Sequence, residues 1–294
     1  MKPAPFEYYA PTTVEESLTL LAEHGYDAKV LAGGQSLIPM MNFRLVQPPI
    51  LVDINNLPEL AYINPDENGG LRLGTMTRHH QVETSPLVEK RAPLIHSAMP
   101  RIAYPQIRSR GTFGGSLSHA DPSAELPSLS VALDGKFRLR SRNGERWVPA
   151  SEFFVGLLTT VMEPDELLVE VALPPLPPRS GWSLMEIARR THDFAMIGIA
   201  AVITLDKKGL CQQARMVFIS AGERPMVAKK AAELLKGQAP TPQAFQAAAE
   251  VAVSEEIDPS SDIHATAEFR RHLAKVLTQR ALAQAFQRAV EERE

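Results

Sequence analysis

The first fifty residues combine one helical pattern with two short apolar runs. Apolar side chains recur at helical spacing over Val14–Ala22, after a Thr13-Val-Glu-Glu sequence that has the form of a capping box. The runs AKVLAG and ILVDI predict buried strands, and a short helix from Ser36 is predicted between them. The sequence GGQS therefore lies where a predicted strand meets a predicted helix.

The middle of the chain mixes strands and helices. GLRLG predicts a strand, the segments that follow through Met99 predict helices, and another helix is predicted from about Ser123 to Leu133. ELLVEVALP predicts a strand that ends at Pro174. The proline cluster LPPLPPRSG (173–181) cannot continue either element, so we expect a domain boundary there, between residues 1–176 and 177–294.

Beyond that boundary the pattern changes from strands to helices. WSLMEIARR, FAMIGIAAVITL and ARMVFIS predict three strands, and alanine-rich helices are predicted at about Arg224–Gly237, Thr241–Val253 and Ala265–Glu291. This order predicts a small antiparallel sheet backed by helices. The fold class of the whole chain is α+β.

Composition narrows the function classes. The chain has 294 residues, 44% of them hydrophobic, and a net charge of −3 with scattered Lys and Arg, which disfavours nucleic-acid binding. The sequence has no apolar run of about 18 residues and no apolar signal-peptide core, so we expect a cytoplasmic protein without a membrane span. Its single cysteine, Cys211, cannot form an internal disulfide or supply the four thiolates of an iron–sulfur cluster.

Two glycine pairs are the main candidates for a binding site. Gly33 and Gly34 precede Ser36, while Gly114 and Gly115 precede Ser116, with Thr112 as a further hydroxyl donor. Glycine lets a backbone approach a ligand closely, and successive N–H groups form a concavity that suits phosphate oxygens. Two such motifs would suit a diphosphate. The alternative is that each pair is only a tight turn, and neither matches the Rossmann or P-loop pattern.

Other polar residues have simpler interpretations. His119, Asp121 and Glu125 could hold a metal ion, but such residues more often cap a helix or bind ribose hydroxyls, so no metal site is predicted. His79 and His80 are expected to be solvated at a helix start. Cys211 is expected to be a small buried side chain, because no His or Asn accompanies it in a catalytic pattern.

Three segments carry a family resemblance. LAGGQSLIPMMNFRL, IAYPQIRSRGTFGGSLSHADPSAELP and ARRTHDFA resemble the FAD-binding medium subunit of the molybdenum hydroxylases, the family of xanthine dehydrogenase and aerobic carbon monoxide dehydrogenase. The resemblance covers nearly the whole chain, with the motifs in family order and spacing. It implies a two-part FAD-binding domain of the vanillyl-alcohol-oxidase (PCMH) type over 1–176, with subdomains of about 1–55 and 56–176. A C-terminal domain of the carbon monoxide dehydrogenase flavoprotein type would occupy 177–294.

The resemblance also implies cofactor-binding positions, and it assigns no catalytic side chain. These positions are Ala32, Gly33, Gly34, Gln35, Ser36 and Leu37 in the first motif, Thr112, Phe113, Gly114, Gly115 and Ser116 in the second, and Ile102, Ala103, Asp121, Glu125, Leu168, Glu186 and Phe194 elsewhere. Glu186 stands where several relatives have lysine, and Phe194 where some have tyrosine. This chain therefore lacks a positive charge and a hydroxyl that could tune the flavin.

The implied function is that of an oxidoreductase subunit. Electrons would pass from a large molybdenum-cofactor subunit through a small [2Fe-2S] subunit to FAD on this chain and on to an external acceptor, in a dimer of heterotrimers. One alternative is a self-contained flavin oxidase of the same fold, although no His or Cys stands in a recognised flavin-attachment motif. The other is a non-enzymatic module whose motifs hold a nucleotide or anion only for assembly.

Overall fold

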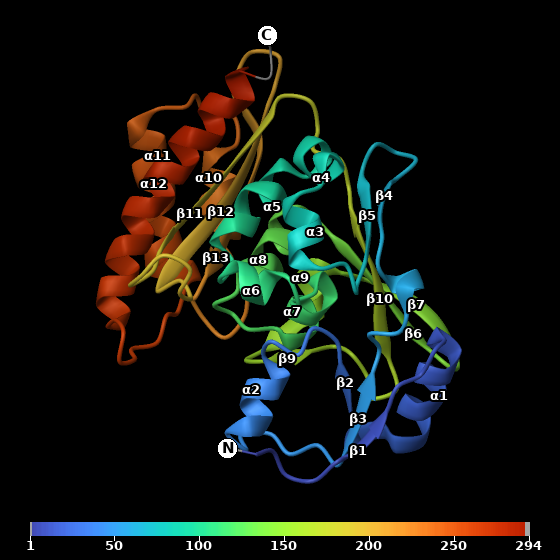
Figure 1. The fold of residues 1–294 in the computed structure, drawn as a ribbon. Coiled ribbons are helices and arrows are strands. Elements are labelled where there is room, and N and C mark those ends of the chain that lie inside the picture. The colour runs from blue at the N-terminus through green and yellow to red at the C-terminus, as the bar shows by residue number, and fades with distance from the viewer. Residues whose placement is uncertain (1, 292–294) are drawn as a thin grey trace.

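The N-terminal part is a small parallel sheet flanked by helices. The computed structural model describes residues 2–291, and Figure 1 shows this part in blue. Its elements are β1 (Glu7–Tyr9), α1 (Val14–His24), the 3-10 turn η1 (Gly25–Asp27), β2 (Ala28–Leu31), α2 (Leu37–Asn42) and β3 (Ile50–Asp53). The strand order is β1-β3-β2. The prediction of two buried strands is right for the central β3, but β2 is only partly buried because it lies at the edge.

A five-stranded antiparallel sheet forms the middle of the molecule. The strand order is β4-β5-β10-β6-β7, so the last strand in sequence pairs in the centre. The strands are β4 (Ile63–Pro65), β5 (Leu71–Gly74), β6 (Lys136–Ser141), β7 (Gly144–Pro149) and β10 (Leu167–Leu173).

Short helices cover this sheet, and several of them begin with proline, whose fixed φ suits a first helical turn. They are η2 (Pro58–Leu60), α3 (His79–Glu83), α4 (Pro86–Arg91), α5 (Pro93–Ala98), η3 (Met99–Arg101), α6 (Pro105–Arg108), α7 (Phe113–His119), α8 (Glu125–Ala132) and α9 (Ala150–Phe153). A hairpin of β8 (Phe154–Gly156) and β9 (Thr159–Thr160) follows α9.

The C-terminal part is the predicted antiparallel sheet with helices. Its strands are β11 (Ser180–Ile187), β12 (Ile197–Leu205), β13 (Cys211–Ile219) and β14 (Met226–Val227), in that order. The helices are α10 (Lys229–Leu235), α11 (Pro242–Val251) with a π turn, η4 (Ala252–Glu256), and α12 (Ala267–Glu291). The helix predicted from Arg224 begins later, because Met226 and Val227 pair with β13. The α+β prediction is confirmed.

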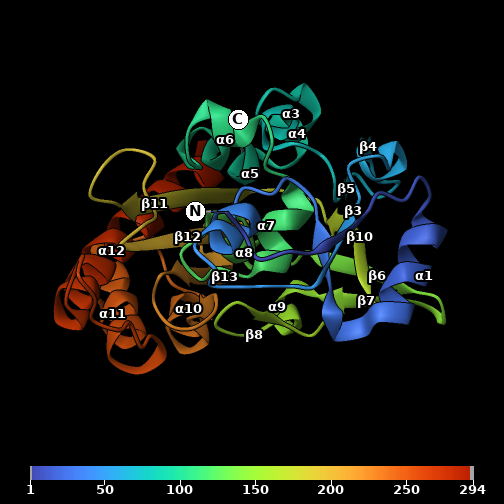
Figure 2. The ribbon, with the colours of Figure 1, turned by 60° about the horizontal axis from the view of Figure 1, so that its bottom comes forward.

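The C-terminal sheet is buried on both faces. On β12, Ile199 and Ile203 pack with the helices α10–α12, whereas Ala200 and Val202 pack with the core that contains α5 and α8. Figures 1 and 2 show the sheet between these two sets of helices. Successive side chains of β12 point to opposite faces of the sheet, and each face belongs to a different hydrophobic core. This explains why IGIAAVITL is apolar at nearly every position. Within residues 2–291, no helix has the length and apolarity to cross a membrane.

The contact between β11 and α12 leaves no room for a side chain at Gly181. A Cβ there would lie 1.9 Å from the Ala285 carbonyl oxygen and 2.4 Å from the Ala289 amide nitrogen. We expect Gly181→Ala to lower the free energy of unfolding by roughly 1–3 kcal/mol, because backbone must move apart. Urea denaturation measures this effect. Gly156→Ala is the matched control, since nothing lies within 4 Å of its Cβ position. Equal midpoints for the two variants would contradict the close contact.

Candidate functional site

The first glycine motif presents a row of unused backbone donors. It connects β2 to α2, and Gly34 has a φ of +72°, a conformation that favours glycine. Within the part of the chain that the structure describes, the amides from Gly33 to Leu37 donate to no protein acceptor. The Gln35 side chain instead folds back and donates to the Gly33 carbonyl at 3.0 Å. These amides are free to bind the oxygens of an anionic ligand.

The second glycine motif is the start of a helix rather than a tight turn. Thr112 caps α7, and its hydroxyl accepts a hydrogen bond from the Gly115 amide at 3.1 Å. The amides of Phe113 and Gly114 donate to the carbonyls of Thr77 and Thr75, each at 2.9 Å. These amides are already committed, so the predicted row of free N–H groups is present only in the first motif.

Packing explains the glycine at 114. A Cβ on Gly114 would lie 2.3 Å from the Thr75 Cβ, so the glycine lets α7 pack against the end of β5. The Phe113 side chain is fully buried, and the Leu168 side chain is also in the core, while the Leu168 carbonyl accepts a hydrogen bond from Thr75 at 2.8 Å. Ser116 is partly exposed, which leaves its hydroxyl open to a ligand.

The first glycine motif touches the backbone that leads directly into the second. A Cβ on Gly33 would lie 2.4 Å from the Arg110 carbonyl oxygen and 2.8 Å from the Gly111 Cα. Side chains that the sequence analysis missed hold this contact: Asn55 donates to the Ala32 carbonyl at 2.8 Å. Arg78 donates to the Asn55 side-chain oxygen at 2.6 Å and also to the Arg110 carbonyl.

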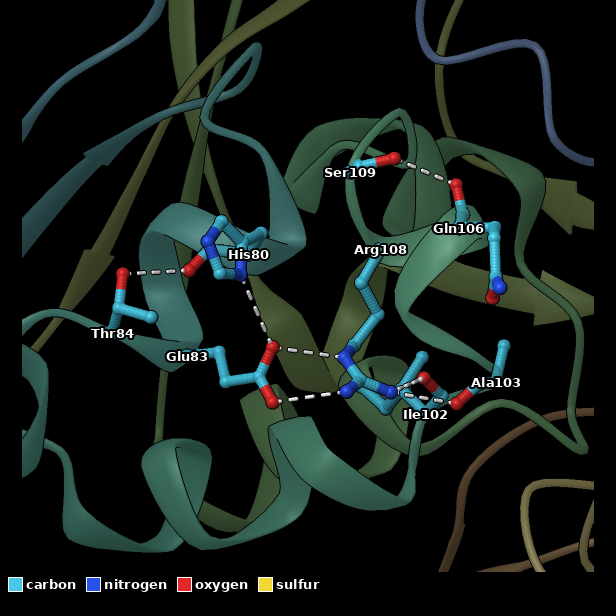
Figure 3. A network of polar contacts seen from close by, with 8 residues as sticks. All are labelled: His80, Glu83, Thr84, Ile102, Ala103, Gln106, Arg108 and Ser109. Carbon is cyan, nitrogen blue, oxygen red and sulfur yellow. Dashed lines mark hydrogen bonds and ion pairs between the residues drawn. The ribbon is translucent and has the colours of Figure 1, made fainter.

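A buried arginine organises the next predicted segment, Ile102 and Ala103 (Figure 3). Arg108 forms a bidentate pair with Glu83 at 2.9 and 3.0 Å, and it donates to the carbonyls of Ile102 and Ala103 at 3.1 and 2.7 Å. Ala103 has a φ of +46°, which is uncommon for a residue with a Cβ. Two hydrogen bonds from Arg108, whose guanidinium is itself fixed by Glu83, hold this conformation.

His79 differs from the sequence prediction. It was expected to be solvated, but it is buried, and its Nε2 lies 3.0 Å from the Thr112 carbonyl oxygen. Burial lowers its pKa to about 4, so the ring is neutral near pH 7 and can donate to Thr112 from Nε2. His80 is exposed, as expected, and lies 3.5 Å from Glu83.

The remaining predicted residues lie in segments near the junction of the C-terminal sheet with the middle of the molecule. The Ser220 amide at the end of β13 donates to the Pro122 carbonyl at 2.9 Å, and its hydroxyl donates to the Ala195 carbonyl at 2.6 Å. Phe194 was predicted within a strand but lies in the loop before β12, 66% exposed. The Tyr104 ring contacts His192 of the same loop, with centroids 5.0 Å apart.

Carboxyl groups dominate this junction. Glu125 begins α8, and burial, followed by the charges of Glu186 and Asp121, raises its pKa to about 8. Burial also raises the pKa of Glu186, whose Oε1 lies 3.7 Å from the Arg101 guanidinium, a contact that lowers it. Asp121 accepts a hydrogen bond from the Ser123 amide at 2.8 Å in the turn before α8.

Two further predictions concern metal and thiol chemistry. Within residues 2–291, no group of three or more His, Cys, Asp or Glu side chains is placed to hold a metal ion. Cys211 is buried, as predicted, and burial raises the pKa of its thiol to about 11. A groove of about 540 Å³ between β13 and α10 shares no residue with the predicted site.

Family models match both parts of the chain. Residues 4–176 match the FAD binding domain in molybdopterin dehydrogenase, and residues 182–285 match the CO dehydrogenase flavoprotein C-terminal domain.

Similar proteins match along almost their full lengths. The alpha subunit of the 6-hydroxypseudooxynicotine dehydrogenase complex of Paenarthrobacter nicotinovorans is 40% identical over 98% of this chain and 97% of its own. The carbon monoxide dehydrogenase medium chain of Hydrogenophaga pseudoflava is 38% identical over 98% of this chain and 99% of its own. The structure of quinoline 2-oxidoreductase from Pseudomonas putida 86 matches with a TM-score of 0.92 and 38% identity, over 98% of this chain and 99% of that chain. The chain therefore belongs to the FAD-binding medium subunits of the molybdenum hydroxylase family.

Proposed function

We propose that this oxidoreductase subunit binds one FAD noncovalently and passes electrons from a [2Fe-2S] subunit to an external acceptor. FAD, when bound, supplies the two-electron redox chemistry that no side chain offers. The observation that carries the proposal is the row of free amides from Gly33 to Leu37, against the backbone of residues 110 and 111 that leads into the second glycine motif. This arrangement fits an anionic group such as a diphosphate.

The rest of the site would then hold the other parts of the cofactor. The hydroxyls of Ser36 and Ser116 would add hydrogen bonds beside the diphosphate. Ile102, Ala103 and Phe194 would surround the ring, since the exposed phenyl group of Phe194 offers an aromatic face at the junction. The Arg108 network would keep the Ile102 and Ala103 carbonyls in fixed positions, so that the ring binds in one orientation.

The partners follow from family membership. Medium subunits of this family work with a small and a large subunit, and we propose that the small one carries the [2Fe-2S] clusters and the large one the molybdenum cofactor. The single cysteine supports this division, because this chain cannot ligate a four-cysteine cluster alone. A dimer of heterotrimers and a cytoplasmic location belong to the same proposal.

The free amides of the first motif generate a prediction about FAD affinity. In the complete complex, we expect Gly34→Ala to weaken FAD binding at least tenfold, about 1.4 kcal/mol, because a Cβ at φ +72° reorients the neighbouring N–H groups. Titration of FAD into the FAD-depleted complex measures the affinity. Gly237→Ala is the matched control, since Gly237 has a φ of +75° and open space around it. Equal FAD affinity in the two variants would show that the first motif is only a turn.

The proposed placement of the clusters and the FAD on different subunits generates a second prediction. We expect the FAD-depleted complex to retain substrate-dependent bleaching of its iron–sulfur absorbance but to lose turnover with the external acceptor, and added FAD should restore turnover. Stopped-flow absorbance on the complex, with the substrate of its large subunit, follows both steps. Substrate oxidation by this chain with FAD but without its partners would instead support the self-contained oxidase.

A further inference from the structure

Two buried acidic side chains lie at the junction where α8 packs against the C-terminal sheet, and the charge of Glu186 acts on Glu125. Glu125 comes from the first turn of α8 and Glu186 from the end of β11. Glu125 is 6% exposed and the Glu186 side chain 12% exposed. The Oε2 atom of Glu186 is buried and has no hydrogen-bond partner within residues 2–291. Both carboxyl groups are thus largely removed from water at the same junction.

The positive charge available to them is insufficient. Within the described residues, Arg101 from η3 is the cation that acts on both groups, and its guanidinium is 46% exposed and lies 3.7 Å from Glu186. Asp121, in the turn before α8, adds a further negative charge that acts on Glu125. Two buried carboxylates beside one half-exposed arginine repel each other, and binding one proton relieves this repulsion.

The position of Arg101 decides where that proton resides. Glu186 contacts the guanidinium and therefore takes the charged form more readily, whereas Glu125 has no ion pair within the described residues. The N-terminus of α8 favours a charged Glu125, but burial and the charge of Glu186 outweigh it and raise the pKa of Glu125 to about 8. Near pH 7 Glu125 is then mainly neutral, while the contact with Arg101 favours the charged form of Glu186.

The pair lies beside the residues proposed to surround the flavin ring. Arg101 directly precedes Ile102 and Ala103, and Ser220 joins Pro122, close to Glu125, to Ala195, next to Phe194. Resting on the proposed FAD site, we propose that Glu125 and Glu186 form one proton-binding pair that couples the reduction potential of the flavin to pH.

The direction in which protonation of Glu125 changes the reduction potential of the flavin follows from electrostatics. Electrons delivered by the partner subunit add negative charge at the site, and a neutral Glu125 opposes this charge less than an ionised one. Loss of the proton from Glu125 therefore lowers the reduction potential. By the same linkage, an added electron pair strengthens proton binding at Glu125, so the pair takes up a proton from solvent as charge arrives.

An infrared titration tests the pair without any flavin. In the FAD-depleted complex, we expect a protonated-carboxyl C=O band that titrates near pH 8 and is absent in Glu125→Gln. Glu186→Gln should move that titration down by roughly one pH unit, because it removes the neighbouring charge. A band that survives Glu125→Gln, or a titration that Glu186→Gln leaves in place, would overturn the pair. Since no FAD is present, these results are independent of the FAD proposal.

Redox titration then tests the coupling in the FAD-loaded complex. We expect the midpoint potential of the wild type to fall more steeply with pH around pH 8 than that of Glu125→Gln, which stays neutral. Glu170→Gln is the control, because Glu170 is a buried carboxylate of the other sheet that pairs with Arg72 at 2.6 Å. The same pH profile in the wild type and Glu125→Gln would show that the pair does not act on the flavin.

Protein stability gives a further readout. Because the pKa of folded Glu125 is raised, its contribution to stability is complete below its ordinary pKa near 4.5 and is lost as pH rises toward 8. The free energy of unfolding of the wild type should therefore fall relative to that of Glu125→Gln between pH 5 and 8. Urea denaturation of the FAD-depleted complex at several pH values measures the difference. A constant difference would contradict the buried proton.

Discussion

The close approach of Gly33 to the backbone of residues 110 and 111 determines the geometry of the whole site. Both surfaces in this contact are main chain, so its distance is set by the absence of a side chain at one position. The contact fixes the first motif, which follows a strand of the small parallel sheet, against the segment that leads into α7, which packs against the end of β5. Asn55 and Arg78 then hold it with hydrogen bonds on either side. A movement of either sheet relative to the other would therefore displace the free amides of Gly33 to Leu37.

A second constraint is the double-sided burial of the C-terminal sheet. Because β12 contributes to two hydrophobic cores, the C-terminal part cannot swing away from the middle of the molecule without exposing Ala200, Val202 and their neighbours to water. Domains joined by small polar surfaces move easily, but this contact is extensive and apolar. The junction that carries Glu125, Glu186 and Phe194 is accordingly held rigidly. Fixed charges at a rigid site cost little reorganisation when electrons arrive.

Local patterns in the sequence predicted most elements well. Helical spacing and a capping threonine located α1, and continuous apolar runs located β3 and β12, because these signals depend on neighbours in sequence. The second glycine motif was interpreted as a phosphate-binding segment or a tight turn, but it begins a helix. Its helix is stabilised by the Thr112 cap and by carbonyls of residues 75 and 77, which are distant in sequence.

The supporting residues could not be predicted for the same reason. Arg108, Asn55 and Arg78 act through partners 5 to 32 residues away, and a lone arginine or asparagine in a polar segment resembles an ordinary surface residue. His79 likewise stands next to the exposed His80 and becomes buried only when residues 111 and 112 fold over it. The family motifs indicated where a ligand could bind, but not which side chains hold those motifs in place.

The burial of Cys211 makes this subunit a convenient scaffold for spectroscopic probes. Thiol reagents attack the thiolate, and a thiol that is 1% exposed with a pKa of about 11 offers almost none at neutral pH. The unmodified chain therefore offers no reactive thiol to a labelling reagent. A cysteine introduced at an exposed position such as Tyr26 or Ile263 would be the single reactive thiol of this chain, and a spin label attached to it before assembly would report distances to the partner subunits.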